Sequence, residues 1–185
     1  MKSWPRSRAE WPRVASVTRW LARRRVPLGF VTAMAAIVLA EPTRTSWSAG
    51  FAIAVAGEAI RVWAAGHLEK SKEVTRSGPY RYSRHPLYAG SAILALGVVV
   101  AVRHPIVGVL AAVYIGVTIT AAIRTEEAYL REQFGSAYDD YLTARGTATE
   151  RRFSVDRAWR NREYRAVIGL VGGFALLALK MIVLL

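Results

Sequence analysis

The sequence contains no cysteine, which excludes disulfide bridges, cysteine-ligated zinc or iron–sulfur centres, and cysteine nucleophiles. Histidine is scarce as well: three histidines are too few for a histidine-rich metal site, and we expect no metal. Acidic residues number 13 against 26 lysines and arginines, so the formal net charge is +13. Disorder is excluded because 53% of the residues are hydrophobic, which provides ample side chains for a core.

The 185 residues suit one domain, and their charges lie between five long apolar runs. Four runs have the length, about 17–25 residues, that a helix needs to cross a bilayer core. The first run is shorter and reaches that length if it starts near Trp20 and its preceding arginines snorkel to the headgroups. The sequence therefore predicts an all-α integral membrane bundle of about five transmembrane helices, with runs at 26–40, 47–66, 86–102, 105–123 and 166–185.

The basic residues are concentrated in alternate connections between these runs. The N-terminal segment 1–25, the loop after the second run and the loop after the fourth hold 22 of the 26 lysines and arginines. The other two loops carry only Arg44 and Arg103. Short loops rich in Lys and Arg stay in the cytoplasm. We therefore expect an inner or plasma membrane protein with its N-terminus inside and its C-terminus outside.

The position of the charge also indicates what the protein binds. A +13 chain could bind nucleic acid, but these basic residues flank apolar spans, so attraction to anionic headgroups explains them better. The first basic stretch and apolar run, ending in Val38-Leu39-Ala40, could also imitate a cleaved signal peptide. We favour a retained helix, because the charged region is long and further spans follow.

The second basic loop carries the strongest chemical signal, the string GPYRYSRHPLYAG at 78–90. Gly78-Pro79 indicates a turn, and Pro86 suits the first turn of a helix. A helix N-terminus favours anions, and Arg84 and His85 lie at that end. Tyr80, Tyr82 and Tyr88 supply flat faces and hydroxyls nearby, so the string could hold a ligand with a carboxylate, an aromatic ring and a cationic centre. The alternative is that these residues form a membrane-interface anchor, because Tyr and Arg are enriched at that level.

A second signal lies just past the fourth run, where Glu126 and Glu127 follow Arg124. Adjacent carboxylates repel each other and therefore remain solvated or find a cation. Acidic residues are unfavourable at a helix C-terminus, so this helix is predicted to continue. The apolar spacing from Tyr129 onward predicts an amphipathic extension through about Leu142.

In these two motifs, the chain resembles the isoprenylcysteine carboxyl methyltransferase and phospholipid methyltransferase group of integral membrane enzymes. The string GPYRYSRHPLYAG and the later EEAYLREQFGSAYDDY occur in the order and at the hairpin spacing of that group. The resemblance covers roughly 57–142. It implies a single membrane methyltransferase domain over 1–185, with a cofactor-binding core at 76–142, a cytoplasmic connector at 143–165 and a last transmembrane helix at 166–185.

The resemblance implies S-adenosylmethionine as cofactor, bound at cytoplasmic helix ends. The soluble methyltransferase fold would show a glycine-rich turn after a strand, and the sequence has none. Glu126 is implied as both a catalytic and a cofactor-binding residue, since a carboxylate can pair with the methionine amino group or offset the sulfonium charge. The implied cofactor-binding residues are Tyr80, Arg84, His85, Pro86, Leu87, Tyr88, Glu126 and Glu127.

The sequence does not identify the methyl acceptor. Relatives often carry an Arg four residues before the first Glu, where this chain has Ala122; Arg124 or an Arg of the connector could substitute as the catalytic cation. A membrane-embedded or lipophilic acceptor is implied, such as an isoprenylcysteine-like carboxylate or a phospholipid amine. The alternatives are a small membrane-permeant thiol and a non-catalytic membrane scaffold. The oligomeric state is not indicated.

Other polar and small residues within the spans allow predictions about how the helices pack. Glu58 and Arg61 share a helix face, and intramembrane charges mark either function or an internal salt bridge. Lys180 is expected to snorkel outward near the C-terminal end. Small residues let membrane helices approach closely, which is the role expected for the last run's Gly169, Gly172 and Gly173.

Overall fold

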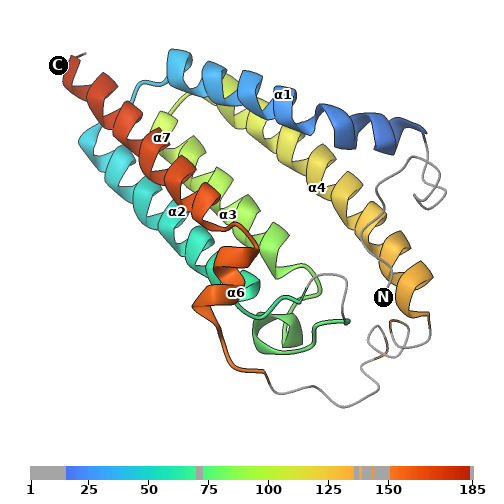
Figure 1. The fold of residues 1–185 in the computed structure, drawn as a ribbon. Coiled ribbons are helices and arrows are strands. Elements are labelled where there is room, and N and C mark those ends of the chain that lie inside the picture. The colour runs from blue at the N-terminus through green and yellow to red at the C-terminus, as the bar shows by residue number, and fades with distance from the viewer. Residues whose placement is uncertain (1–15, 70–72, 136–137, 139–142, 144–150, 184–185) are drawn as a thin grey trace.

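The computed structural model describes residues 16–69, 73–135, 138, 143 and 151–183 (Figure 1). No strand occurs in these ranges, so the prediction of an all-α protein is confirmed. Five long helices are joined by short elements and loops. They are α1 (Ser16–Leu39), α2 (Arg44–Ala65), α3 (Pro86–Val102), α4 (Pro105–Phe134) and α7 (Tyr164–Val183), with the shorter η2 (Gly78–Arg81) and α6 (Val155–Arg160).

Each predicted apolar run overlaps one long helix: the runs at 86–102 and 105–123 lie wholly within α3 and α4, and those at 26–40 and 47–66 end one residue after α1 and α2. Three of these helices, α2, α4 and α7, are long and apolar enough to cross a membrane. The segment Pro27–Leu39 of α1 and the whole of α3 are also apolar, but they are shorter than these three helices. Helix α1 begins at Ser16, upstream of the start expected near Trp20, and continues through Pro27.

Successive long helices run in alternate directions, which gives the bundle two distinct ends (Figure 1). One end, here called the far end, is where α1 and α3 finish. There the Glu41 N–H donates to the Val102 carbonyl at 2.9 Å and joins the α1–α2 connection to the end of α3. The motif end is the opposite one, where α2 and α4 finish and where α3 and α7 begin. Both motifs of the sequence therefore lie at one end of the bundle.

Lys180 does not snorkel outward as expected. Its Nζ donates hydrogen bonds to the carbonyls of Ile37 at 2.8 Å and Val38 at 2.7 Å. These carbonyls belong to the last turn of α1, where helical backbone acceptors have no partner within their own helix. A cation is also favoured at a helix C-terminus. Lys180 thus caps α1 and fastens it to α7 at the far end.

The close helix contact lies between α2 and α3 and depends on glycine. A Cβ built at Gly57 would lie 2.5 Å from the Leu94 nitrogen, and one at Gly97 would lie 2.5 Å from the Ala54 nitrogen. By contrast, no atom of the described residues lies within 4 Å of a Cβ built at any of the three glycines of α7. The prediction that Gly169, Gly172 and Gly173 allow close packing was therefore wrong, because they face away from the neighbouring helices.

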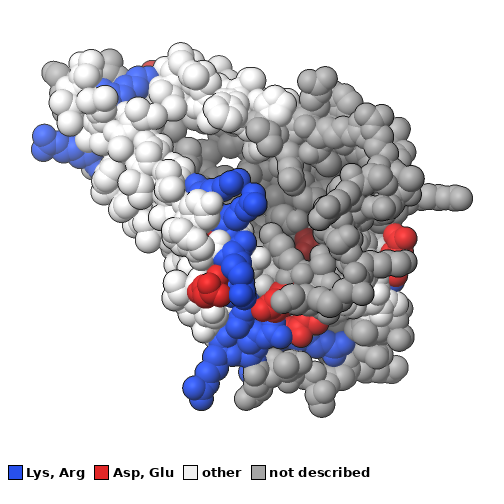
Figure 2. Space-filling view, in the orientation of Figure 1, with Lys and Arg blue, Asp and Glu red and all other residues white. Residues whose placement is uncertain are grey.

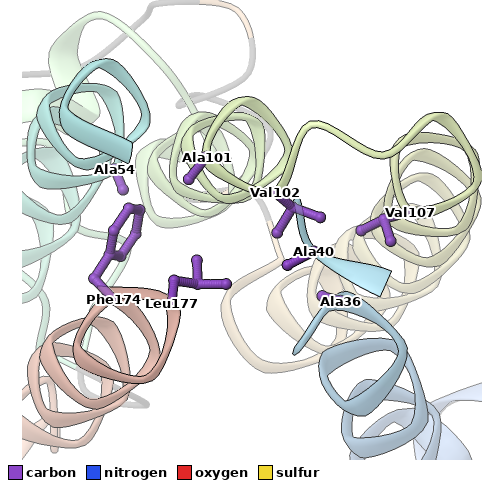
Figure 3. Packing of buried hydrophobic residues seen from close by; sticks show 8 residues of the cluster. All are labelled: Ala36, Ala40, Ala54, Ala101, Val102, Val107, Phe174 and Leu177. Carbon is purple, nitrogen blue, oxygen red and sulfur yellow. The ribbon is translucent and has the colours of Figure 1, made fainter. Parts of the chain in front are cut away.

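The buried core lies toward the far end of the bundle, and Figure 3 shows small side chains facing two larger ones from α7. Trp47 and Phe51 stack at 5.2 Å between centroids, and Phe174 meets both rings edge-on. The Trp47 indole also donates to the Phe174 carbonyl at 2.9 Å. The labelled core residues are Ala36, Ala40, Ala54, Ala101, Val102, Val107, Phe174 and Leu177.

At the motif end, the C-terminus of α2 is capped by residues from the distant connector. The Asn161 amide donates to the carbonyls of Ala65 at 2.8 Å and Leu68 at 3.0 Å. The Arg157 guanidinium donates to the Gly66 carbonyl at 2.7 Å and pairs with Glu69 at 3.2 Å. These bonds satisfy acceptors that α2 leaves free and place α6 beneath α2.

Candidate functional site

The candidate site begins at Gly78, where the chain turns into the short helix η2. Gly78 has φ +58°, a conformation that suits glycine, and a Cβ there would lie 2.6 Å from Cγ of His67. His67 is buried and its Nδ1 lies 2.9 Å from the Trp63 carbonyl, so its ring is held by α2. The predicted turn is confirmed, and η2 carries Tyr80 into a buried position.

Helix α3 starts where the motif predicts, with His85 as its N-cap and Pro86 as its first residue. The Ser83 hydroxyl accepts from the His85 backbone N–H at 3.2 Å, which fixes the entry to the helix. The rings of His85 and Tyr88 lie 5.9 Å apart and are tilted by 39°. Pro86 is buried, while the side chains of Leu87 and Tyr88 are half-buried.

A side-chain contact joins the two motifs. His85 Nε2 lies 3.2 Å from Oε1 of Glu127, although 42 residues separate them. Glu127 comes from the extension of α4, and its side chain is 30% exposed, so the pair remains open to water on one side. The start of α3 and the acidic end of α4 therefore form one polar surface at the motif end.

Tyr138 lies buried close to the charges of this surface, and the sequence predicted no site role for it. Its side chain is 1% exposed. Burial and the nearby charges of Glu127 and Glu126 raise the pKa of Tyr138 to about 12, and Arg131 and Arg84 act in the opposite direction. The phenol therefore stays neutral among these charges. The tyrosine three residues after Gly135 in the second motif was the signal that could have identified it.

The remaining candidates lie on the same segments with different exposure. Arg84 is exposed and Glu126 is half-buried. Arg124 is exposed on α4 and makes no ion pair with a residue that the structure describes. Ala122, at the position of the family arginine, is half-buried. The described ranges hold no group of three metal-ligating side chains.

The predicted extension of α4 through Leu142 was wrong in its length. Helix α4 ends at Phe134, because Gly135 follows with φ +49° and ψ −122°, a backbone conformation that helical residues do not adopt. The Gly135 N–H donates back to the Arg131 carbonyl at 2.9 Å and closes the last turn. Of the rest of the predicted extension, residues 136–137 and 139–142 lie outside the described part of the chain.

Glu58 and Arg61 form an internal ion-pair network. The Arg61 guanidinium lies 3.2 Å from Glu58 and 2.8 Å from Glu163, and it also donates to the Ser91 hydroxyl. Both carboxylates are buried. The network joins α2, α3 and the residue directly before α7. Of the two interpretations of this pair, the structure therefore supports an internal salt bridge. The two residues also share a helix face, as predicted.

Comparison with known proteins agrees with these two motifs. The profile of the phospholipid methyltransferase family matches residues 31–137. A probable protein-S-isoprenylcysteine O-methyltransferase from rice (Oryza sativa subsp. indica) is 32% identical over 104 residues, which cover 50% of this chain and 54% of the rice protein. The protein-S-isoprenylcysteine O-methyltransferase of Schizosaccharomyces pombe is 32% identical over 90 residues, covering 49% of this chain and 38% of the yeast protein.

The chain thus spans about half the length, or less, of these relatives. No solved structure matches the chain significantly. The family match covers more than half of the sequence and includes α2, the loop with His85, and α4 with Glu127. On this basis, the chain belongs to the phospholipid methyltransferase family.

Proposed function

We propose that the protein is an S-adenosylmethionine-dependent methyltransferase that acts on a lipophilic acceptor at the membrane. The observation that carries the proposal is the contact between His85 and Glu127, which unites the two motifs at one end of the bundle. Family membership and the two named relatives support the reaction class.

The side chains at the motif end fit this cofactor by their chemistry. S-adenosylmethionine supplies an electrophilic methyl group on a sulfonium. The carboxylates of Glu126 and Glu127 would hold its cationic groups, and the rings of Tyr80 and Tyr88 would attract a sulfonium by about 0.5–2 kcal/mol each. His85 would position Glu127, and Arg84 would hold an anionic group such as the cofactor's carboxylate. Pro86 and Leu87 would line the cofactor site at the start of α3.

The membrane arrangement is part of the proposal. We place five crossings at α1, α2, α3, α4 and α7, with the N-terminus and the motif end in the cytoplasm, in the inner or plasma membrane. The three helices that are long enough to span support this, as does the concentration of basic residues in alternate loops. A polar cofactor would enter from water, and a lipophilic acceptor would arrive from the bilayer.

The acceptor atom decides how much acid–base chemistry the site requires. A carboxylate or a thiolate attacks without a general base, whereas an amine must first lose a proton. Arg124 is the proposed substrate-side cation, because it is exposed and lies one half-turn before Glu126 on α4. An isoprenylcysteine-like carboxylate would match this cation. A phospholipid amine and a small permeant thiol are the other acceptors to test.

Cofactor binding is the direct test of the site. Glu126→Gln removes a charge-assisted hydrogen bond from a half-buried position, which corresponds to about 1.5–3 kcal/mol or a 10- to 150-fold weaker affinity. Glu132→Gln is the matched control, since Glu132 is exposed on the same helix. Isothermal titration of the purified protein with S-adenosylmethionine measures both. Equal affinities for the two variants would remove Glu126 from the site.

The reaction itself is tested by transfer of a labelled methyl group to membrane extract, followed by identification of the labelled product. His85→Ala should abolish labelling while leaving the apolar helices untouched. A scaffold, the rival from another class, would bind no S-adenosylmethionine and label nothing. Binding without labelling of any lipid, prenylated or thiol fraction would contradict the proposed acceptor class.

Sidedness is tested by cysteine labelling, which is clean because the native chain has no cysteine. Ser83 is exposed beside His85 at the motif end, and Ser77 in the same loop is buried. Ser83→Cys should react with an impermeant maleimide only after the membrane is opened, and Ser77→Cys should react slowly in either case. Reaction of Ser83→Cys in sealed cells would reverse the proposed orientation.

A further inference from the structure

A second feature of the molecule lies between α2 and α7, apart from the residues of the candidate site. An open groove of about 510 Å³ runs along these two helices. Its walls include Phe51, Val55 and Trp63 of α2 and Val167 and Val171 of α7, and Phe153 of the connector lies at one end. Glu58, whose carboxylate pairs with Arg61, is the charged residue of an otherwise apolar lining. This volume falls in the range of sites that hold small ligands.

The groove has the length of one lipid chain. Phe51 and Trp63 are 12 residues apart on α2, so its wall extends about 18 Å at 1.5 Å per residue. One leaflet of a bilayer core is about 15 Å thick, half of about 30 Å. Both helices that form the groove are long and apolar enough to span a membrane. An extended acyl chain therefore matches the groove in length and polarity.

The two ends of the groove differ. Toward the far end, Phe51 belongs to the stacked aromatic cluster with Trp47 and Phe174, which limits the groove there. Toward the motif end, Phe153 lies beside α6, where Trp159 is 64% exposed and stacks on Tyr164 at 4.6 Å. Exposed tryptophan and tyrosine mark the headgroup level of a membrane. The mouth of the groove is therefore at the depth of lipid phosphates.

The mouth is also strongly basic. Figure 2 shows Lys and Arg gathered in a stripe over the motif end, while most of the described surface above it is uncharged. The segment 151–165 contains six arginines and two acidic residues. Half of these arginines are already paired, since Glu69, Glu73 and Asp156 contact Arg151, Arg157 and Arg160.

The other three arginines are exposed. Arg152, Arg162 and Arg165 make no ion pair with any residue in the described ranges. Arg152 directly precedes Phe153, and Arg165 lies two residues before Val167, so both are next to groove-lining residues in the chain. None of the three has a carboxylate partner in the described ranges, although the Arg165 guanidinium lies 6.0 Å from the centre of the Tyr164 ring. Positive charges at headgroup level complement an anionic phosphate. A second copy of the chain would bring the same positive charge and would be repelled.

We infer that this groove binds one acyl chain of an anionic phospholipid, with the lipid phosphate at Arg152, Arg162 and Arg165. The inference goes beyond the proposed function, since the groove includes no residue of the candidate site and its occupant need not be methylated. The lipid would fill the space between α2 and α7 and hold the connector against the membrane surface.

The test is native mass spectrometry of the full chain released from detergent, with phosphatidylglycerol and phosphatidylcholine of identical acyl chains at equal concentration. One retained phosphatidylglycerol per chain is expected, at least tenfold more abundant than phosphatidylcholine. Val171→Trp places a ring in the groove from a side chain that is 58% exposed, and should reduce retention at least fivefold. Val113→Trp is the matched control, because Val113 is 59% exposed on α4 and lines no part of the groove.

Two further variants test the groove and the arginines separately. If Val171→Trp does not purify as a single species, Val55→Trp fills the same groove from α2. The double variant Arg152→Gln and Arg162→Gln should abolish the preference for phosphatidylglycerol while one lipid of either kind is retained. Equal retention of the two lipids by the native protein would overturn the inference, as would full retention after filling of the groove or dimers in place of lipid adducts. The assay contains no S-adenosylmethionine, so its result is independent of the proposed reaction.

Discussion

The contact between α2 and α3 supports a quantitative prediction, because backbone meets backbone there. A Cβ at Gly57 would lie 2.5 Å from the Leu94 nitrogen and 2.7 Å from the Gly90 carbonyl oxygen. Neither atom can rotate away as a side chain would. Gly57→Ala must therefore push the two helices apart over the length of their contact.

The size of the effect follows from the cost of overpacking, which is about 1–3 kcal/mol. Alanine also favours the helix over glycine by up to about 1 kcal/mol, which masks part of that cost. Gly116→Ala on α4 isolates the clash, since a Cβ at Gly116 meets no atom within 4 Å in the part of the chain that the structure describes, and the substitution gains the same helix propensity. The difference between the two variants should therefore be about 1–3 kcal/mol, with Gly57→Ala the less stable.

The measurement is thermal unfolding of both purified variants in the same detergent. A change of 1 kcal/mol corresponds to about 2–4 °C in Tm for a chain of this length, so Gly57→Ala should melt about 2–12 °C below Gly116→Ala. The wild type should lie between them or close to Gly116→Ala. A Tm for Gly57→Ala equal to that of Gly116→Ala would refute the close approach of α2 and α3.

Three further predictions concern single positions. Because the pKa of Tyr138 is about 12 in the folded state and 10 when unfolded, the unfolded state loses its proton first, so stability should fall by about 2–3 kcal/mol between pH 10 and 12. Tyr138→Phe should remove that part of the fall in a pH series of Tm values, and an identical fall in both proteins would contradict it. Gly78→Ala forces a left-handed alanine against His67 and should lower stability by about 1–2 kcal/mol; an unchanged Tm would show that the turn relaxes freely. Lys180→Met loses the charged bonds to two carbonyls of α1 and should destabilise by about 1.5–3 kcal/mol, whereas Leu179→Met, at an exposed position, should not; equal melting of these two would remove the cap.

Features that depend on neighbouring residues in the chain were predictable. The uncharged run from Pro86 corresponds to α3, and the start of α3 at Pro86 follows from the missing proline N–H. The resemblance carried by the two motifs implied that His85 and the acidic pair belong to one site, and His85 lies 3.2 Å from Glu127 in the structure.

Features that depend on tertiary partners were not predictable. The glycines of α7 and those of α2 and α3 look alike in sequence, and only the packing shows that Gly57 and Gly97 form the close contact. The partner of Lys180 lies 143 residues away on α1. Likewise, Glu58 and Arg61 indicated a shared face, but the second acid of their network, Glu163, lies beyond the predicted spans.

The capping of α2 by the connector constrains the order in which the protein assembles. Arg157 reaches the Gly66 carbonyl across 91 residues, Asn161 reaches the Ala65 carbonyl across 96, and Glu163 pairs with Arg61 across 102. During synthesis these partners emerge only after the first four long helices are complete. Until then α2 ends in carbonyls without these donors, and Arg61 has only the partners of its own helix and α3. Attachment of the connector and α7 is therefore the step that completes the bundle. A chain arrested before residue 151 would contain both motifs, but its α2 would lack the capping residues of the connector and the neighbouring helix α7.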